Sequence, residues 1–162
     1  MAYEAVALLL LLLLVANGTP VVLKRVLGDR GARPIDGGRR FRDGRPLLGR
    51  SKTWRGLAGG LVATALAAWV LGAGAWLGAL VALAAHLGDM ASSFTKRRLA
   101  IASSGRALGI DQIPESLLPA LATAWPLGLG VVDVALVVAL FLVGELALSR
   151  LLFRLGIRDE PY

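Results

Sequence analysis

The 162-residue sequence contains no cysteine and a single histidine, His86. Without cysteine the chain can form neither a disulfide framework nor a thiolate metal site. One histidine cannot supply a histidine cluster for a metal ion, and no Ser-His-Asp set for nucleophilic catalysis is available. Chemistry in this chain therefore depends on carboxylates, hydroxyls and basic side chains.

Charge is also scarce, and it is absent from long stretches of the chain. Charged residues make up 18% of the sequence and apolar residues 56%, and the charges stand in blocks between apolar runs. About 20 apolar residues in a helix cross the roughly 30 Å hydrocarbon core of a bilayer. We therefore predict an all-α integral membrane protein that forms one membrane-embedded domain over residues 1–162. The five predicted transmembrane helices cover residues 4–23, 54–71, 75–95, 113–125 and 130–153.

All 18 basic residues fall into three segments of the sequence. Residues 24–55 hold 11 of them, residues 96–106 hold four, and the segment from Arg150 onward holds three. With five spans, these segments lie on one side of the membrane, which the positive-inside rule makes cytoplasmic. We expect a multi-pass protein of the cell membrane with its N-terminus outside and its active site on the cytoplasmic face. The first apolar run has no basic n-region and no small-residue cleavage site, so we expect a retained span and not a signal peptide.

The densest polar stretch covers residues 88–98, at the expected cytoplasmic end of the third span. At helical spacing Ser92 and Ser93 share a face with Asp89, and Lys96 shares a face with Ser92. Asp89 lies seven residues before Lys96, hence about 10 Å deeper along the helix axis, where an unpaired carboxylate is costly. Either an ion pair with an arginine of the same stretch or a functional site would explain this acid.

A second acid, Asp111, stands at the expected start of the fourth span, on the same side of the membrane. It can cap that helix, since aspartate is favoured at helix N-termini. Alternatively, Asp89 and Asp111 meet at the inner membrane surface and hold Mg²⁺, which is commonly shared between carboxylates and substrate phosphates. The neighbouring basic residues Lys96, Arg97 and Arg98 would then neutralise the remaining phosphate charge.

The first polar loop, about residues 24–53, is long for a compact protein, which is typical of a loop that carries function. It ends in Ser51, Lys52 and Thr53, and Arg55 follows. These residues offer hydroxyls, an ammonium group and backbone N–H groups to an anion, although their spacing is not that of a P-loop. Lys52 and Arg55 can also be explained as basic anchors at the membrane surface. A second cytoplasmic loop is expected at about residues 96–112.

Three stretches together resemble the archaeal CDP-archaeol synthase family, which is similar in turn to bacterial and eukaryotic CDP-diacylglycerol synthases. They are Pro34-Ile35-Asp36-Gly37, the run from Gly49 to Gly56, and the run from Gly88 through Lys96-Arg97-Arg98 to Asp111-Gln112. The bacterial signature continues past its aspartate with a His-Gly-Gly stretch and an Asp-Arg pair. Here Gln112-Ile113-Pro114-Glu115 follow instead, so the bacterial lipid specificity does not carry over.

The resemblance implies a CTP-dependent cytidylyltransferase that requires Mg²⁺. It would join CMP to the phosphate of an ether-linked isoprenoid glycerol lipid, of the 2,3-bis-O-geranylgeranylglycerol 1-phosphate type, giving CDP-archaeol and pyrophosphate. The expected catalytic residues are Asp89, Asp111 and Lys96, with the two acids as metal ligands. The expected substrate-binding residues are Asp36, Ser51, Lys52, Thr53, Arg55, Ser92, Ser93, Arg97 and Arg98. Expected partners are CTP, the lipid phosphate and membrane lipids; we expect no nucleic acid, and a homo-oligomer stays open.

The residues fit this chemistry independently of the resemblance. The lipid phosphate can attack the α-phosphorus of CTP in line, so no protein nucleophile is needed. The protein must instead hold two anions together, and positioning with charge stabilisation would supply the catalysis.

Other polar residues within the spans leave further interpretations open. Glu115 lies near the active face and can assist it, Glu145 lies toward the inner end of the fifth span, and Asp133 suits a helix start. For His86 we expect a polar contact between helices. A transporter or channel lined by intramembrane acids is the competing interpretation. A CDP-alcohol phosphotransferase is disfavoured, because its Asp-Gly…Ala-Arg…Gly…Asp…Asp pattern is absent.

Overall fold

The computed structural model describes residues 2–102, 105 and 107–156. Within that part of the chain all regular elements are helices, which confirms the predicted all-α architecture. In chain order they are α1 (Tyr3–Leu27), α2 (Trp54–Val70), α3 (Ala75–Arg98), α4 (Gln112–Ala122), α5 (Ala124–Leu127) and α6 (Val131–Arg154).

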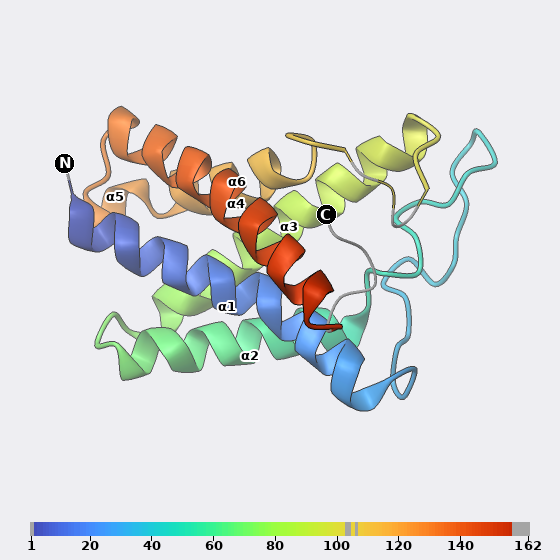
Figure 1. Cartoon of the computed structure of the whole chain (residues 1–162), viewed down its shortest axis with the longest axis horizontal. Coiled ribbons are helices and arrows are strands. Elements are labelled where there is room, and N and C mark those ends of the chain that lie inside the picture. The colour runs from blue at the N-terminus through green and yellow to red at the C-terminus, as the bar shows by residue number, and fades with distance from the viewer. Residues whose placement is uncertain (1, 103–104, 106, 157–162) are drawn as a thin grey trace.

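The long helices run side by side between two ends of the molecule, as Figure 1 shows. Helix α3 packs against α1, α2 and α4, and α6 closes the bundle against α1 and α4. The core between them is apolar and includes Leu9, Leu12, Leu13, Val81 and Val137, all fully buried. The start of α1 lies at one end, and the loop of residues 28–53 lies at the other (Figure 1). We call this second end the polar end.

Three helices of the described chain are long and apolar enough to cross a membrane: Tyr3–Leu27, Ala75–Arg98 and Val131–Leu151. Helix α2 is apolar but has only 17 residues. The predicted fourth span, residues 113–125, is shorter than expected and broken. Helix α4 ends at Ala122, and the single turn α5 follows, because Pro126 has no N–H group with which to continue the helical ladder. The count of five spans therefore stays a prediction.

Local chemistry explains where two of the helices begin. The Thr53 hydroxyl accepts a hydrogen bond from the Gly56 backbone N–H (3.1 Å) and so caps α2. Asp133 caps α6, because its carboxylate accepts hydrogen bonds from the backbone N–H groups of Gly130 and Ala2, both at 3.0 Å. The expected helix-start duty of Asp133 is confirmed, and the contact with Ala2 also ties the start of α1 to α6.

The loop at the polar end is folded and not merely extended. Two antiparallel bridges, Pro34 with Thr53 and Arg40 with Pro46, pair distant parts of it. Between them the Asp36 carboxylate accepts three backbone N–H groups, from Gly38 (2.9 Å), Leu48 (2.9 Å) and Gly49 (3.1 Å). Burial alone would raise the pKa of Asp36, but these hydrogen bonds outweigh it and hold the pKa below its ordinary value. Asp36 thus stays ionised and organises the loop.

Helices α3 and α4 approach closely at Gly88. A Cβ atom on this residue would lie 2.5 Å from the carbonyl carbon of Pro114 and 2.8 Å from Cα of Glu115. Only glycine permits this crossing without a shift of backbone. The crossing places Glu115 of α4 beside the turn of α3 that carries Asp89.

Candidate active site

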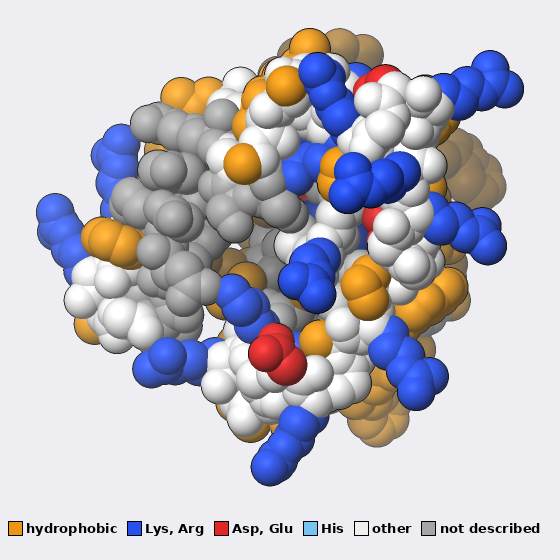
Figure 2. All heavy atoms as spheres, turned by 90° about the vertical axis from the view of Figure 1, so that its right-hand side faces the viewer, with side chains coloured by type: hydrophobic (Ala, Val, Ile, Leu, Met, Phe, Trp, Pro, Cys, Tyr) orange, Lys and Arg blue, Asp and Glu red, His pale blue; other side chains and the backbone are white. Residues whose placement is uncertain are grey.

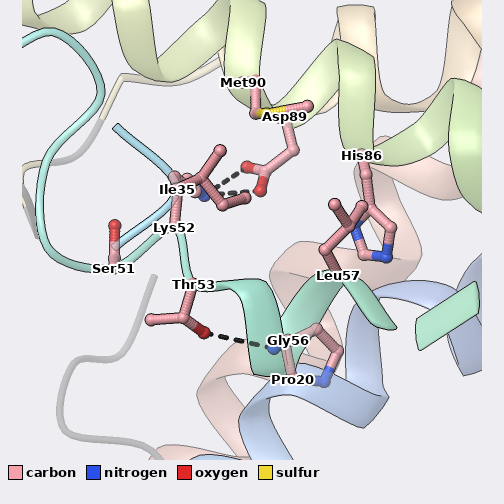
Figure 3. A pocket seen from close by; sticks show the side chains of 10 residues that line it. All are labelled: Pro20, Ile35, Ser51, Lys52, Thr53, Gly56, Leu57, His86, Asp89 and Met90. Carbon is pink, nitrogen blue, oxygen red and sulfur yellow. Dashed lines mark hydrogen bonds and ion pairs between the residues drawn. The ribbon is translucent and has the colours of Figure 1, made fainter. Parts of the chain in front are cut away.

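The first half of the site is an ion pair between the polar loop and α3. The Lys52 ammonium lies 2.5 Å from each carboxylate oxygen of Asp89, as Figure 3 shows. Lys52 immediately precedes Thr53, which forms an antiparallel bridge with Pro34, and the Ile35 N–H donates to the Lys52 carbonyl oxygen (2.8 Å). The folded loop therefore delivers this ammonium to Asp89. Of the two explanations considered for this acid, an ion pair with an arginine of its own stretch is not seen among the described residues.

The second half is an ion pair between α3 and the start of α4. Nζ of Lys96 lies 2.7 Å from Oδ1 of Asp111, and the two side chains are only 10% and 23% exposed. Asp111 is the residue before α4, yet its side chain makes no capping hydrogen bond to that helix. The interpretation of Asp111 as a helix cap is therefore wrong in this structure, and its carboxylate faces Lys96 instead.

The acids of both halves act on one ammonium group. Burial alone would lower the pKa of Lys52, but Asp89 outweighs that effect, and Glu115 and Asp111 add to it, so the pKa lies above its ordinary value. Lys52 is therefore a fixed cation at neutral pH. Asp89, Asp111 and Glu115 thus all lie near enough to Lys52 to act on its charge.

Glu115 is the acid near the site for which the sequence predicted the least definite role. It is buried, at 9% exposure, in the first turn of α4. A buried carboxylate beside two other acids is costly unless cations accompany it. The signal that could have found it was the spacing of four residues from Asp111, which puts both acids on one side of the α4 start.

Basic side chains dominate the surface around these pairs. Figure 2 shows the polar end, where Lys and Arg side chains far outnumber the acidic ones. The exposed ones include Arg30, Arg33, Arg39, Arg42 and Arg50 of the loop. Such a concentration of positive charge raises the local concentration of anions and steers them to the site.

Asp89 and Asp111 are the two acids expected to hold a divalent cation. Both carboxylates are partly open, at 26% and 23% exposure, and each already holds a cation in the form of a lysine ammonium. Among the described residues, no group of three or more His, Asp or Glu side chains is arranged to hold a metal by itself. Carboxylates are ligands that Mg²⁺ prefers, and the ion is commonly shared with substrate phosphates, so joint binding of the ion by Asp89 and Asp111 stays a prediction.

Comparison with known proteins shows to which family the chain belongs. The CarS-like family, described as CDP-archaeol synthase, matches residues 3–77 and 69–162. The chain belongs to the CDP-archaeol synthase family. The CDP-archaeol synthase of Thermococcus kodakarensis is 36% identical over 161 residues, covering 91% of this chain and 89% of that one. The synthase of Thermococcus onnurineus is 40% identical over 122 residues, 68% of each chain.

A solved structure agrees with this assignment to the CDP-archaeol synthase family. It is described as "Structural insight into an intramembrane enzyme for archaeal membrane lipids biosynthesis" and shares 38% sequence identity. The match has a TM-score of 0.67 and covers 88% of this chain and 90% of the other. The fold described above is thus that of an intramembrane enzyme, and the expected family is confirmed.

Several residues that we expect to bind substrate contact other residues of the protein in this structure. The guanidinium of Arg98 stacks on the rings of Phe41 and Phe94, 4.7 and 4.9 Å from their centroids. It also bonds Asp43 (3.0 Å) and the Pro46 carbonyl (2.5 Å), which docks the loop on α3. Direct contact of Arg98 with substrate stays a prediction.

The remaining expected substrate-binding residues divide by location. Ser51 and Thr53 line the same pocket as Lys52 and Asp89. Arg55 points elsewhere and donates to the carbonyl oxygens of Gly28 and Arg30.

Within α3, Ser92 and Ser93 are buried, and the Ser92 hydroxyl donates to the Asp89 carbonyl (2.9 Å). Arg97, also buried, donates to the Ala102 carbonyl (2.9 Å). Of the expected set, the structure brings together Ser51, Lys52, Thr53 and Asp89 at the pocket and Lys96 with Asp111 beside it.

Proposed function

We propose that the polar end binds CTP and the lipid phosphate side by side between Lys52, Asp89, Lys96 and Asp111. As a member of the CDP-archaeol synthase family, the chain is a CTP-dependent cytidylyltransferase that acts on an archaeal lipid phosphate. The observation that carries the proposal is the convergence of two lysine–aspartate pairs at the ends of membrane helices. There the triphosphate comes from water and the lipid phosphate from the bilayer.

Asp89 and Asp111 would hold Mg²⁺ together with phosphate oxygens of the substrates. Bound there, the ion would offset phosphate charge and stabilise the departing pyrophosphate. Each carboxylate is partly open and faces an ammonium group in this structure.

Lys52 and Lys96 would bind phosphate oxygens. An ammonium that pairs with a carboxylate can pair equally with a phosphate, because three rotatable donors tolerate either geometry. When Mg²⁺ occupies the carboxylates, the two lysines would remain within reach of the substrate phosphates. Their ammonium groups would then stabilise the negative charge of the transferred group. Fixed cations of this kind supply catalysis without a protein nucleophile.

The lipid chains would lie along the apolar helices, and the reaction would take place at the cytoplasmic face. We propose five spans, an external N-terminus and location in the cell membrane, supported by the gathering of basic residues at one end. The lipid would be of the 2,3-bis-O-geranylgeranylglycerol 1-phosphate type. A homo-oligomer stays a prediction without further support.

Assay of the detergent-purified chain tests this function directly. The chain is incubated with Mg²⁺, each of the four nucleoside triphosphates in turn, and a panel of ether-linked isoprenoid and ester-linked diacyl lipid phosphates. We expect a product with the mass of the CDP-lipid, from CTP and the isoprenoid ether lipid, with one pyrophosphate released per turnover. Absence of that product with every lipid, under conditions where the protein remains folded, would refute the proposal.

A further inference from the structure

The polar loop contains an open hollow beside the pocket at Lys52 and Asp89. It measures about 370 Å³, which is within the range of sites for small molecules. Its lining combines aliphatic side chains, a turn and one arginine: Ile35, Asp36, Gly37, Arg39, Leu47 and Leu48. All six residues belong to the loop and none to a helix, so a molecule in the hollow comes from the aqueous side of the polar end.

Hydrogen bonds within the loop hold the walls of this hollow in place. The Asp36 carboxylate accepts the Leu48 N–H (2.9 Å), and the Asp36 carbonyl oxygen accepts the Arg39 N–H (3.0 Å). The Arg39 carbonyl oxygen in turn accepts the Leu47 N–H (2.9 Å). A site whose walls are fixed before its ligand arrives loses less conformational freedom on binding, which favours affinity.

The hollow adjoins the residue that supplies the ammonium group of the site. Ile35 lines both the hollow and the pocket that contains Lys52 and Asp89, and Figure 3 shows it beside these two residues. Its backbone N–H donates to the Lys52 carbonyl oxygen (2.8 Å). A ligand that occupies the hollow can therefore extend past Ile35 to Lys52.

The pocket at Lys52 and Asp89 is itself too small for a nucleoside. It leaves about 30 Å³ free, room for no more than a few water molecules. One of its walls is His86, whose Nε2 atom is buried at Gly60 of α2 and forms no hydrogen bond, so that atom does not make the polar contact expected for this residue. Phosphates can approach Lys52 from the mouth of the pocket, but a base needs space elsewhere.

We propose that the hollow receives the base and ribose of CTP while the triphosphate extends to Lys52, and that the Arg39 guanidinium stacks on the base. Arg39 forms no ion pair among the described residues, so its planar group is not committed to a carboxylate. A guanidinium is attracted to the face of an aromatic ring and lies flat against it. The aliphatic side chains of Leu47 and Leu48 offer the same ring an apolar surface.

The chemistry of the two substrates explains why the nucleoside and not the lipid fits this place. A nucleoside is flat on one side, polar and dissolved in water, and the hollow lies on a loop at the aqueous end of the molecule. The isoprenoid chains of the lipid need the apolar surfaces of the helices instead. The assignment rests on the proposed function of the same site, and it makes Arg39 a residue that contacts CTP.

Calorimetric titration of the detergent-purified chain with Mg²⁺ tests the assignment, with CTP and inorganic triphosphate as the two ligands. Inorganic triphosphate can reach Lys52 but has no base to stack. We expect Arg39→Ala to raise the Kd for CTP about fivefold to tenfold, the value of one stacking contact, and to leave the Kd for inorganic triphosphate within about twofold. Leu47→Ala should change the two constants in the same sense. Arg42→Ala, which removes an exposed arginine of the same loop outside the hollow, should leave both constants near those of the parent.

Three results would overturn the assignment while leaving the cytidylyltransferase function intact. They are an unchanged Kd for CTP in Arg39→Ala, an equal rise in Kd for both ligands, and an Arg42→Ala variant that behaves like Arg39→Ala. A raised KM for the lipid phosphate in Arg39→Ala, with the Kd for CTP unchanged, would show that the hollow takes the lipid instead. Failure of the unaltered chain to bind CTP at all would refute the proposed function itself.

Discussion

Lys52 is the residue on which the two halves of the site depend most. It reaches Asp89 from a loop 37 positions earlier in the chain and also lies within the field of Asp111 and Glu115. An anchor at the membrane surface would be expected to point its ammonium outward into water and headgroups. Here the side chain is only 19% exposed and turned toward acids, which favours a role in the reaction.

Loss of the Lys52 ammonium should therefore impair catalysis and not only membrane insertion. We expect Lys52→Ala to lower kcat/KM by about 30- to 1000-fold, the usual cost of one charge that stabilises a transition state. Arg42→Ala is the matched control, because Arg42 is an exposed basic residue of the same loop. Near-unchanged turnover in Lys52→Ala, measured as CDP-lipid formed, would return Lys52 to the role of an anchor.

At the scale of single residues, the sequence indicated that Asp89 needs a cation but did not indicate which residue supplies it. The spacing on α3 predicted that Asp89 is deep and needs a cation, but the cation comes from the loop, and loop folding depends on hydrogen bonds that have no sequence period. Asp36 shows the same limit. Its backbone partners at Gly38, Leu48 and Gly49 follow from the tertiary fold of the loop.

Among the elements, the polar loop is held to the helices by Arg98. Its guanidinium stacks on two aromatic rings and bonds two groups of the loop at once, which a planar fork can do and an ammonium cannot. The loop in turn positions Lys52. An arginine expected to contact substrate thus affects the site through the element that it secures.

Replacement of Arg98 should loosen the loop. We expect both Arg98→Ala and Arg98→Lys to increase hydrogen exchange of the backbone amides of residues 39–47, with helix α2 unaffected. Hydrogen exchange measured by mass spectrometry in detergent checks this. Protection of residues 39–47 that matches the parent protein in both variants would show that other contacts hold the loop.

The crossing of α3 and α4 is the second critical feature at this scale. We expect Gly88→Ala to destabilise the fold by about 1 to 3 kcal/mol, because its Cβ would press on the backbone at Pro114 and Glu115. Gly144→Ala on α6 is the control, since nothing lies within 4 Å of its added Cβ and alanine favours helix. Melting in detergent that ranks Gly144→Ala below Gly88→Ala would contradict the proposed crossing.

The molecule as a whole is divided into an apolar body and one polar end. Composition and apolar runs were sufficient to predict this division, because a bilayer imposes the length of a helix and the exclusion of charge. They did not predict the break between α4 and α5, where Pro126 and the packing of α4 on α3 and α6 decide the ends. Asp133 caps a helix at the far end, whereas Asp89 and Asp111 lie at the polar end.

Single cysteines can test the orientation of this division, since the chain has none of its own. We expect a cysteine at Arg42, in the polar loop, to be protected from a membrane-impermeant thiol reagent in right-side-out vesicles. A cysteine at Ala75, at the opposite end, should react. The reverse pattern, or equal labelling of both, would contradict the proposed topology of five spans with a cytoplasmic polar end.

The central claim is that Asp89 and Asp111 jointly hold the metal ion of cytidylyl transfer. The most direct measurement is electron paramagnetic resonance of Mn²⁺, a spectroscopic substitute for Mg²⁺, titrated into the purified protein with CTP present. We predict that Asp89→Asn and Asp111→Asn each weaken protein-bound Mn²⁺ by at least about tenfold while melting nearly as the parent does. Asp29→Asn, an exposed acid of the loop, should bind Mn²⁺ normally. Unweakened Mn²⁺ binding in both folded variants, or the failure of both to fold, would contradict the claim and leave the two acids as structural partners of Lys52 and Lys96.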